Sequence, residues 1–203
     1  MKTYTLKIPT RAIKTAMEAV AECKRSYEKA REDREALKAG YESGMITRVK
    51  YEKDMATLAE IEPMATAKAL EAINAQAKAY AEAIDSQVTP DGKDLAGNPD
   101  YLLLRDSLVD SPEVLGRIIE RNAESAAFRI ACGNYGQAHG WEEYSGYFVN
   151  EKGVREYGEE VFRIATNGAK FPFGYDAMRC ETEGEVERIA GVMGVSAEYA
   201  QGE

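Results

Sequence analysis

Histidine and tryptophan are nearly absent from this chain, whose 203 residues include one of each, His139 and Trp141. A Ser-His-Asp or Cys-His mechanism would therefore have to use His139. The residues around it, GNYGQAHGW, lack the strand–nucleophile–helix pattern of a hydrolase. The sequence therefore assigns no catalytic residue. A small enzyme or ligand-binding protein centred on His139 is kept as a third functional hypothesis.

Cysteine is also scarce. Cys23, Cys132 and Cys180 are far apart, odd in number, and form no C-x-x-C pair. We expect reduced, mostly buried thiols and no disulfide framework. Zinc sites need several cysteine and histidine ligands at short spacings, and this chain does not offer them. No metal site is therefore predicted.

Motifs for nucleotide binding and acid–base catalysis are missing as well. Neither G-x-x-x-x-G-K-[ST] nor G-x-G-x-x-G occurs. The acid pairs Glu142-Glu143 and Glu159-Glu160 consist of adjacent residues, which do not face one another on a helix and so suit a general acid–base couple poorly. The sequence therefore predicts no cofactor.

Long apolar runs are lacking. No stretch approaches the roughly 20 apolar residues that a membrane helix needs, and the first residues, MKTYTLKIPTR, do not resemble a signal peptide. The composition is 44% hydrophobic and 30% charged, which is enough apolar material for a core. We expect a soluble, cytoplasmic protein that does not contact a membrane.

Charge is unevenly distributed. Residues 1–56 contain 13 basic and 9 acidic residues, whereas residues 57–203 contain 13 basic and 26 acidic residues. The acidic body would repel phosphate backbones, so no direct binding of DNA or RNA is expected through it. It would instead suit a basic partner. One alternative function follows: a phage or mobile-element inhibitor, of the anti-restriction or anti-CRISPR type, that displaces nucleic acid from a basic enzyme. Candidate acids for such a surface are Glu156, Glu159 and Glu160.

The first ninety residues predict a short extended arm at residues 3–8 and two or more helices. A seven-residue apolar repeat over 11–38 places Val20 and Tyr27 on the same stripe, interrupted only by Arg34. This pattern is typical of a coiled-coil seam, which another helix must cover. The next helix is expected after Gly40 and Gly44, with Thr47 as its N-cap.

Residues 37–58 resemble the SHOCT family, a small helical hairpin associated with oligomerisation. Gly44, Ile46-Thr47 and Tyr51 carry the resemblance, and this chain differs in having Arg48 and Lys50 where that family has acidic residues. The resemblance implies a helical hairpin at this point.

Further along, Pro63 is expected to interrupt or kink the second helix, and an alanine-rich helix follows with Leu70, Ile73 and Tyr80 on its stripe. The proline- and glycine-rich residues 89–100 predict a linker between a first domain, 1–88, and an acidic, aromatic-rich helical domain, 101–203. The helices expected in this second domain cover about 111–133, 151–168 with Gly168 as its stop, and 182–194. Residues 169–178 are expected to form an aromatic loop.

The aromatic residues of the second domain have two alternative roles. Tyr135, Trp141, Tyr144 and Tyr147 are expected to seal its helices; together with Phe171, Phe173 and Tyr175 they would alternatively form an exposed surface, because aromatic residues are enriched at binding hot spots. The sequence thus predicts a mainly α protein with a long antiparallel helical hairpin. Its first functional hypothesis is a non-catalytic module for self-assembly or for binding a protein partner. The candidate contact residues are Val20, Tyr27, Tyr135, Trp141, Tyr144, Tyr147, Glu156, Glu159, Glu160, Phe171 and Phe173.

Overall fold

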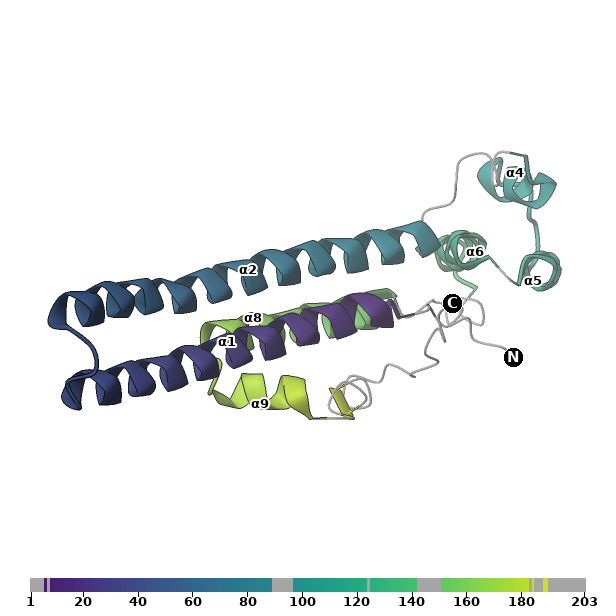
Figure 1. Cartoon of the computed structure of the whole chain (residues 1–203). Coiled ribbons are helices and arrows are strands. Elements are labelled where there is room, and N and C mark those ends of the chain that lie inside the picture. The colour runs from purple at the N-terminus through teal and green to yellow at the C-terminus, as the bar shows by residue number, and fades with distance from the viewer. Residues whose placement is uncertain are drawn as a thin grey trace. The chain divides into compact units, whose positions relative to one another are not determined.

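A computed structural model describes residues 6, 8–88, 97–123, 125–141, 151–182, 184 and 188–189. Seven helices lie within these ranges (Figure 1): α1 Thr10–Glu42, α2 Arg48–Val88, α4 Pro99–Arg105, α5 Pro112–Arg121, α6 Ala126–Ala138, α8 Glu151–Lys170 and α9 Tyr175–Glu181. The predicted mainly α fold with a long hairpin is confirmed, since α1 and α2 form that hairpin. None of these helices is both long and apolar enough to span a membrane.

The described residues group into two compact units. The hairpin unit contains residues 10–79 together with described residues of 158–189, and the cluster unit contains Leu6, Ile8 and described residues of 80–157. This grouping differs from the sequential division at residues 89–100, because a segment from the C-terminal half packs with the hairpin. Most of the predicted linker, and most of the predicted arm and last helix, lie outside the described residues.

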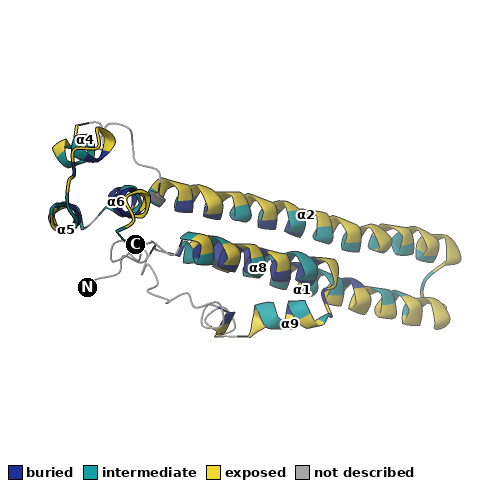
Figure 2. Cartoon of the chain, turned by 180° about the vertical axis from the view of Figure 1, so that it is seen from behind, coloured by how far each residue is buried: buried dark blue, intermediate teal, exposed yellow. Residues whose placement is uncertain are grey.

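Burial along α1 follows the predicted repeat. Ile13, Ala16, Val20, Cys23 and Ala30 are all buried. Beyond Ala30 the helix is half-buried or exposed, as Figure 2 shows. The part of the hairpin near its turn is thus a pair of helices without a buried core along α1, whereas the part that contains the first half of α1 has a covered core.

The turn between α1 and α2 is closed by backbone hydrogen bonds. Gly44 has a φ of 77°, its N–H donates to the Tyr41 carbonyl, and the Met45 N–H donates to the Gly40 carbonyl. These bonds form a Schellman motif, which favours glycine at the left-handed position. As predicted, Thr47 caps α2, because its hydroxyl accepts a hydrogen bond from the Lys50 N–H.

Helix α2 continues through Pro63 to Val88, so the predicted interruption is wrong. Pro63 is exposed, and water can therefore satisfy the helix carbonyl that a proline leaves without its usual donor. Ile73 is fully buried as predicted, but the neighbouring buried position is Ala69, with Leu70 half-buried.

Helices α8 and α9 provide the cover for α1. Gly168 lies against Val20: a Cβ built on the glycine would lie 3.0 Å from Val20 Cγ1 and 3.1 Å from Ala177 Cα of α9. The Cys23 thiol donates to the Ala169 carbonyl over 3.7 Å. Gly168 is therefore a close-packing position and not the predicted helix stop, since α8 continues to Lys170.

Gly168→Ala is expected to lower the free energy of unfolding, because the new methyl group would press on the Ala177 backbone, which cannot swing away. Overpacking of this kind costs about 1–3 kcal/mol, partly offset by roughly 1 kcal/mol of improved helix propensity. Urea denaturation measures the net loss. In a Val20→Ala background the loss should shrink, and a Gly168→Ala protein as stable as the wild type would contradict the packing role.

The cluster unit has its own apolar core, built by α4, α5 and α6. The buried residues of this core are Leu104, Val109, Leu115, Ile118, Ile119, Phe128, Cys132 and Tyr135. The single helix predicted for 111–133 is wrong: α5 ends at Arg121, and α6 begins at Ala126. The break has a local cause, because Ser125 caps α6 by accepting a hydrogen bond from the Phe128 N–H.

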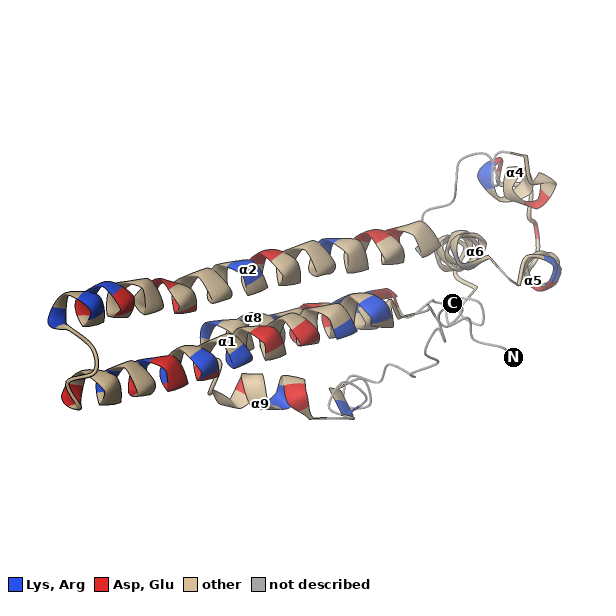
Figure 3. Ribbon diagram, in the orientation of Figure 1, with Lys and Arg blue, Asp and Glu red and all other residues tan. Residues whose placement is uncertain are grey.

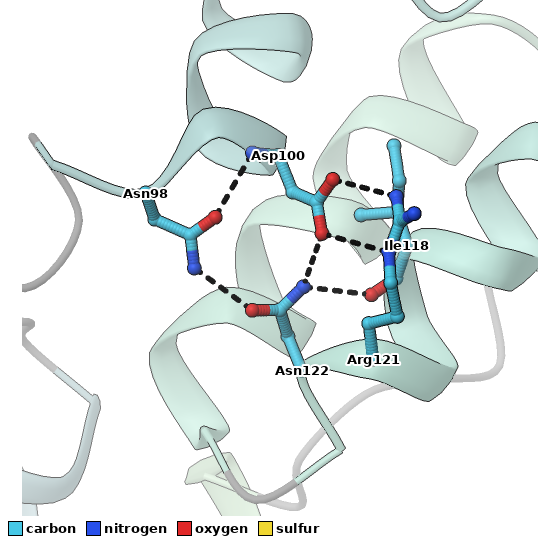
Figure 4. A network of polar contacts seen from close by, with 5 residues as sticks. All are labelled: Asn98, Asp100, Ile118, Arg121 and Asn122. Carbon is cyan, nitrogen blue, oxygen red and sulfur yellow. Dashed lines mark hydrogen bonds and ion pairs between the residues drawn. The ribbon is translucent and has the colours of Figure 1, made fainter.

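A polar network joins the start of α4 to the end of α5 (Figure 4). The Asp100 carboxylate accepts two hydrogen bonds from the Arg121 guanidinium, at 2.6 and 3.1 Å, and one from Asn122 at 2.9 Å. Asn98 caps α4 by accepting from the Asp100 N–H and also donates to Asn122. The Asp100 side chain is 14% exposed, whereas that of Arg121 is 60% exposed, so only the Asp100 side of the network is shielded from solvent.

Asp100→Ala is expected to destabilise the cluster unit by about 1–2 kcal/mol, because charged hydrogen bonds are lost while the Asn122 amide keeps fewer partners. Thermal or urea unfolding measures the effect. Asp110→Ala is the matched control, since Asp110 is exposed and should change stability by less than about 0.5 kcal/mol. Equal losses in the two variants would argue against the network.

Candidate functional site

Four large apolar side chains around the α8–α9 turn face solvent: Phe171, Phe173, Tyr175 and Met178, which we call the aromatic patch. They are between 57% and 72% exposed. Exposed apolar groups that gather in one place mark interaction sites more often than scattered ones do. The structure therefore exposes the three aromatic residues of 171–175 that the sequence placed on the alternative surface.

The backbone beneath the aromatic patch is tightly held. The chain leaves α8 after Lys170, and the Gly174 N–H donates to the Phe171 carbonyl over 2.8 Å. A Cβ on Gly174 would lie 3.0 Å from that carbonyl oxygen, which explains the glycine. Ala177 is fully buried beside Gly168, so α9 packs directly against α8 at this position. Helix α9 therefore replaces part of the aromatic loop that was predicted for 169–178.

Polar contacts also fix α9 to its neighbours. Lys24 of α1 pairs with Glu181 at 2.7 Å, and Asn167 of α8 donates to Asp176 over 3.0 Å. Arg179 lies 5.7 Å from the centre of the Tyr175 ring, within the range of a cation–π contact. The patch thus lies on α9 and on the turn that leads into it, and α9 is restrained by polar contacts with α1 and α8.

An open groove of about 540 Å³ borders the patch between α1 and α9. Its lining residues are Lys24, Glu28, Phe173, Met178, Glu181 and Thr182. Tyr27 packs against Phe173 of this lining, with the two ring centres 6.3 Å apart, and its hydroxyl lies 3.0 Å from the Thr66 hydroxyl. The groove combines apolar walls with the carboxylate of Glu28, since the carboxylate of Glu181 is already bound by Lys24. This combination suits an apolar side chain that has a basic neighbour.

Two candidate contact residues from the hairpin stripe are already used inside the chain. Val20 is 1% exposed and lies against Gly168. Tyr27 is half-buried between Thr66 and Phe173. Val20 is therefore not available to a partner in this fold, while Tyr27 supports the groove from its side.

The tyrosine, histidine and tryptophan near the end of α6 form an aromatic stack in the cluster unit. Tyr135 is buried and donates its hydroxyl to the Val109 carbonyl over 2.9 Å, and Trp141 is half-buried against the same core. The His139 ring stacks on Tyr135 at 4.1 Å, with Nδ1 2.9 Å from the Tyr135 carbonyl. These contacts make Tyr135 and Trp141 part of the packing of the cluster unit, which is the first of the two roles considered for them. Tyr144 and Tyr147 lie outside the described residues.

The candidate acids on α8 are partly neutralised. Glu156 lies 3.7 Å from Lys152, and Glu160 makes a close ion pair with Arg163, which lowers the pKa of that carboxyl. Glu159 is exposed, with no basic partner in the part of the chain that the structure describes. Figure 3 likewise shows basic and acidic residues interspersed along α1. The charges needed for a nucleic-acid mimic are therefore not concentrated at these three glutamates.

The three cysteines lie in surroundings that disfavour the reactive thiolate form. Burial raises the pKa of the Cys132 and Cys180 thiols to about 12, and it also raises that of Cys23. Thiolates, the nucleophilic form, are accordingly rare near neutral pH. No group of three or more His, Cys, Asp or Glu side chains within the described ranges is arranged to hold a metal ion.

Comparisons with known proteins assign no family. No family model, curated protein or solved structure matches the chain. The SHOCT resemblance of residues 37–58 is thus neither supported nor contradicted, and the function has to be inferred from the geometry.

Several residues of the site were not predicted from the sequence. Met178 and the groove residues Lys24, Glu28 and Glu181 come together because α9 packs on α1, a contact between segments about 150 residues apart. No spacing in the sequence indicates that contact. The cluster of Phe171, Phe173 and Tyr175 was visible as a composition signal, but its exposure was not.

Proposed function

We propose that the protein is a non-catalytic self-assembly module whose contact surface is the aromatic patch with its adjoining groove. The observation that supports this proposal is the exposure of Phe171, Phe173, Tyr175 and Met178 on one short, anchored segment. Covering these side chains removes apolar area from water, which is the main driving force of protein association.

The restrained backbone favours binding. A surface that is already ordered loses less conformational entropy on association than a mobile one. Here the Gly174–Phe171 hydrogen bond, buried Ala177 and the Lys24–Glu181 ion pair hold the patch in place before any contact forms. Aromatic side chains on such a surface also carry much of the binding energy in known interfaces.

The proposal is tested by sedimentation of the wild-type protein and of Phe173→Ser/Met178→Ser from low to high micromolar concentration. We expect the wild type to associate as concentration rises and the double variant to remain monomeric. Met64→Ser is the matched control, because Met64 is 68% exposed on α2 and belongs neither to the patch nor to the lining of the groove, so its loss should leave association unchanged. A wild type that stays monomeric throughout would refute self-assembly.

A further inference from the structure

The hairpin turn carries a second exposed apolar group in the same unit as the aromatic patch. Met45 is 84% exposed and Val49 is 77% exposed. The ring of Tyr41, near the end of α1, stacks on that of Tyr51, near the start of α2, with the ring centres 4.6 Å apart, and the Schellman hydrogen bonds close the turn. We call residues 43–53 the hairpin tip. It is a small, preformed projection rather than a loose loop.

The hairpin tip is basic. It contains Arg48, Lys50 and Lys53 against the single acid Glu52, and Figure 3 shows the basic residues at the start of α2. Arg48 is paired with Glu52 at 2.7 Å. No acidic side chain among the described residues pairs with Lys50 or Lys53, so these two ammonium groups remain available to a partner.

The groove beside the aromatic patch offers apolar walls and carboxylates, which complement the apolar and basic groups of the hairpin tip. Phe173 and Met178 provide apolar walls, and Glu28 and Glu181 provide carboxylates. Glu181 is already bound by Lys24. Glu28 has no basic partner in the described part of the chain and is free to pair with an incoming cation.

A hairpin tip cannot reach the groove of its own chain. Glu28 and the end of the helix at Glu42 lie on the same continuous α1, and their separation of 14 positions spans about 21 Å at roughly 1.5 Å per residue. Because a helix does not fold back on itself, a hairpin tip that occupied the groove would have to come from a second molecule.

We propose that the hairpin tip of one copy docks into the groove of the next copy. Met45 and Val49 would pack against Phe173 and Met178, while Lys50 approaches Glu28. The tip and the groove are different surfaces of one unit, so the contact is heterologous and leads to an open chain or a closed ring. This inference rests on the proposed self-assembly and specifies its geometry.

A mixing experiment tests the direction of the contact. The tip variant Met45→Ser/Val49→Ser keeps an intact groove, and the groove variant Phe173→Ser/Met178→Ser keeps an intact tip. Each variant alone should sediment as a monomer, whereas an equimolar mixture should form a one-to-one dimer that grows no further. Circular dichroism checks that both variants retain the helical content of the wild type.

A charge exchange tests the pairing of Lys50 with Glu28. Lys50→Glu and Glu28→Lys should each weaken association about tenfold, because each places like charges together across the interface. The double variant Lys50→Glu/Glu28→Lys should recover most of the wild-type affinity, since the charges are opposite again. Lys14→Glu on α1 is a control charge reversal outside the contact and should have little effect.

These experiments distinguish a failure of the tip-to-groove contact from a failure of self-assembly itself. A tip variant that associates as strongly as the wild type, or a mixture of variants that stays monomeric, overturns the head-to-tail contact. If the groove variant is then still monomeric by itself, self-assembly through the aromatic patch stands with another partner surface. A wild type without any association overturns both.

Discussion

Val20→Asp should unfold the hairpin unit rather than dissociate an assembly of intact molecules. Val20 is 1% exposed and lies against Gly168, so an aspartate there would be a buried carboxylate without a basic partner. Substitutions that bury an unpaired charge are among the few that lower the free energy of unfolding by about 4 kcal/mol or more. Since whole domains are stable by roughly 5–15 kcal/mol, most of the stability of this unit would be lost.

Val49→Asp is the matched control for this prediction. It introduces the same carboxylate at a valine that is 77% exposed in the hairpin tip, so helical content and the urea midpoint should stay close to those of the wild type. Far-ultraviolet circular dichroism during urea titration measures both variants. A folded Val20→Asp protein with an unchanged midpoint would show that α8 does not cover α1 at this position.

Alkylation of the native thiols should be very slow at Cys132. With a pKa of about 12, its thiolate fraction at pH 8 is about 10³-fold smaller than that of an ordinary exposed thiol, whose pKa is near 8.5. The side chain is also fully buried, which blocks the reagent. The alkylation rate should keep rising as pH increases above 9, where an exposed thiol has levelled off.

Iodoacetamide labelling followed by mass spectrometry of peptides resolves the three cysteines separately. Cys180 is half-buried and should therefore be labelled before Cys132, although its thiol also has a raised pKa. The same protein in denaturing urea is the control, because all three thiols should then react at similar rates. Rapid native labelling of Cys132 would contradict the close packing of α4, α5 and α6 around it.

The hairpin shows which features of the fold can be predicted from short-range sequence patterns. The apolar repeat of α1, the glycine turn and the Thr47 cap were all predicted, because each depends on residues within one or two helical turns of one another. Pro63 shows the limit of such rules, since an exposed proline is tolerated inside a 41-residue helix that other contacts support. Gly168 was predicted as a stop, yet its role depends on Val20, which lies 148 positions earlier in the chain.

The sequence by itself determined that the protein is mainly helical and that its first ninety residues contain a long helical hairpin. It also indicated that histidine, cysteine and metal chemistry are poorly supported. These conclusions follow from composition and from short-range periodicity. Only the tertiary structure decided that α8 and α9 cover the hairpin, which buries Val20, exposes the aromatic patch and forms the groove. Such contacts join segments that are distant in the sequence, and they depend on how well the two surfaces fit and on how much apolar area they bury. A repeat of apolar residues shows that a helix has an apolar face, but it does not show which other helix will cover that face.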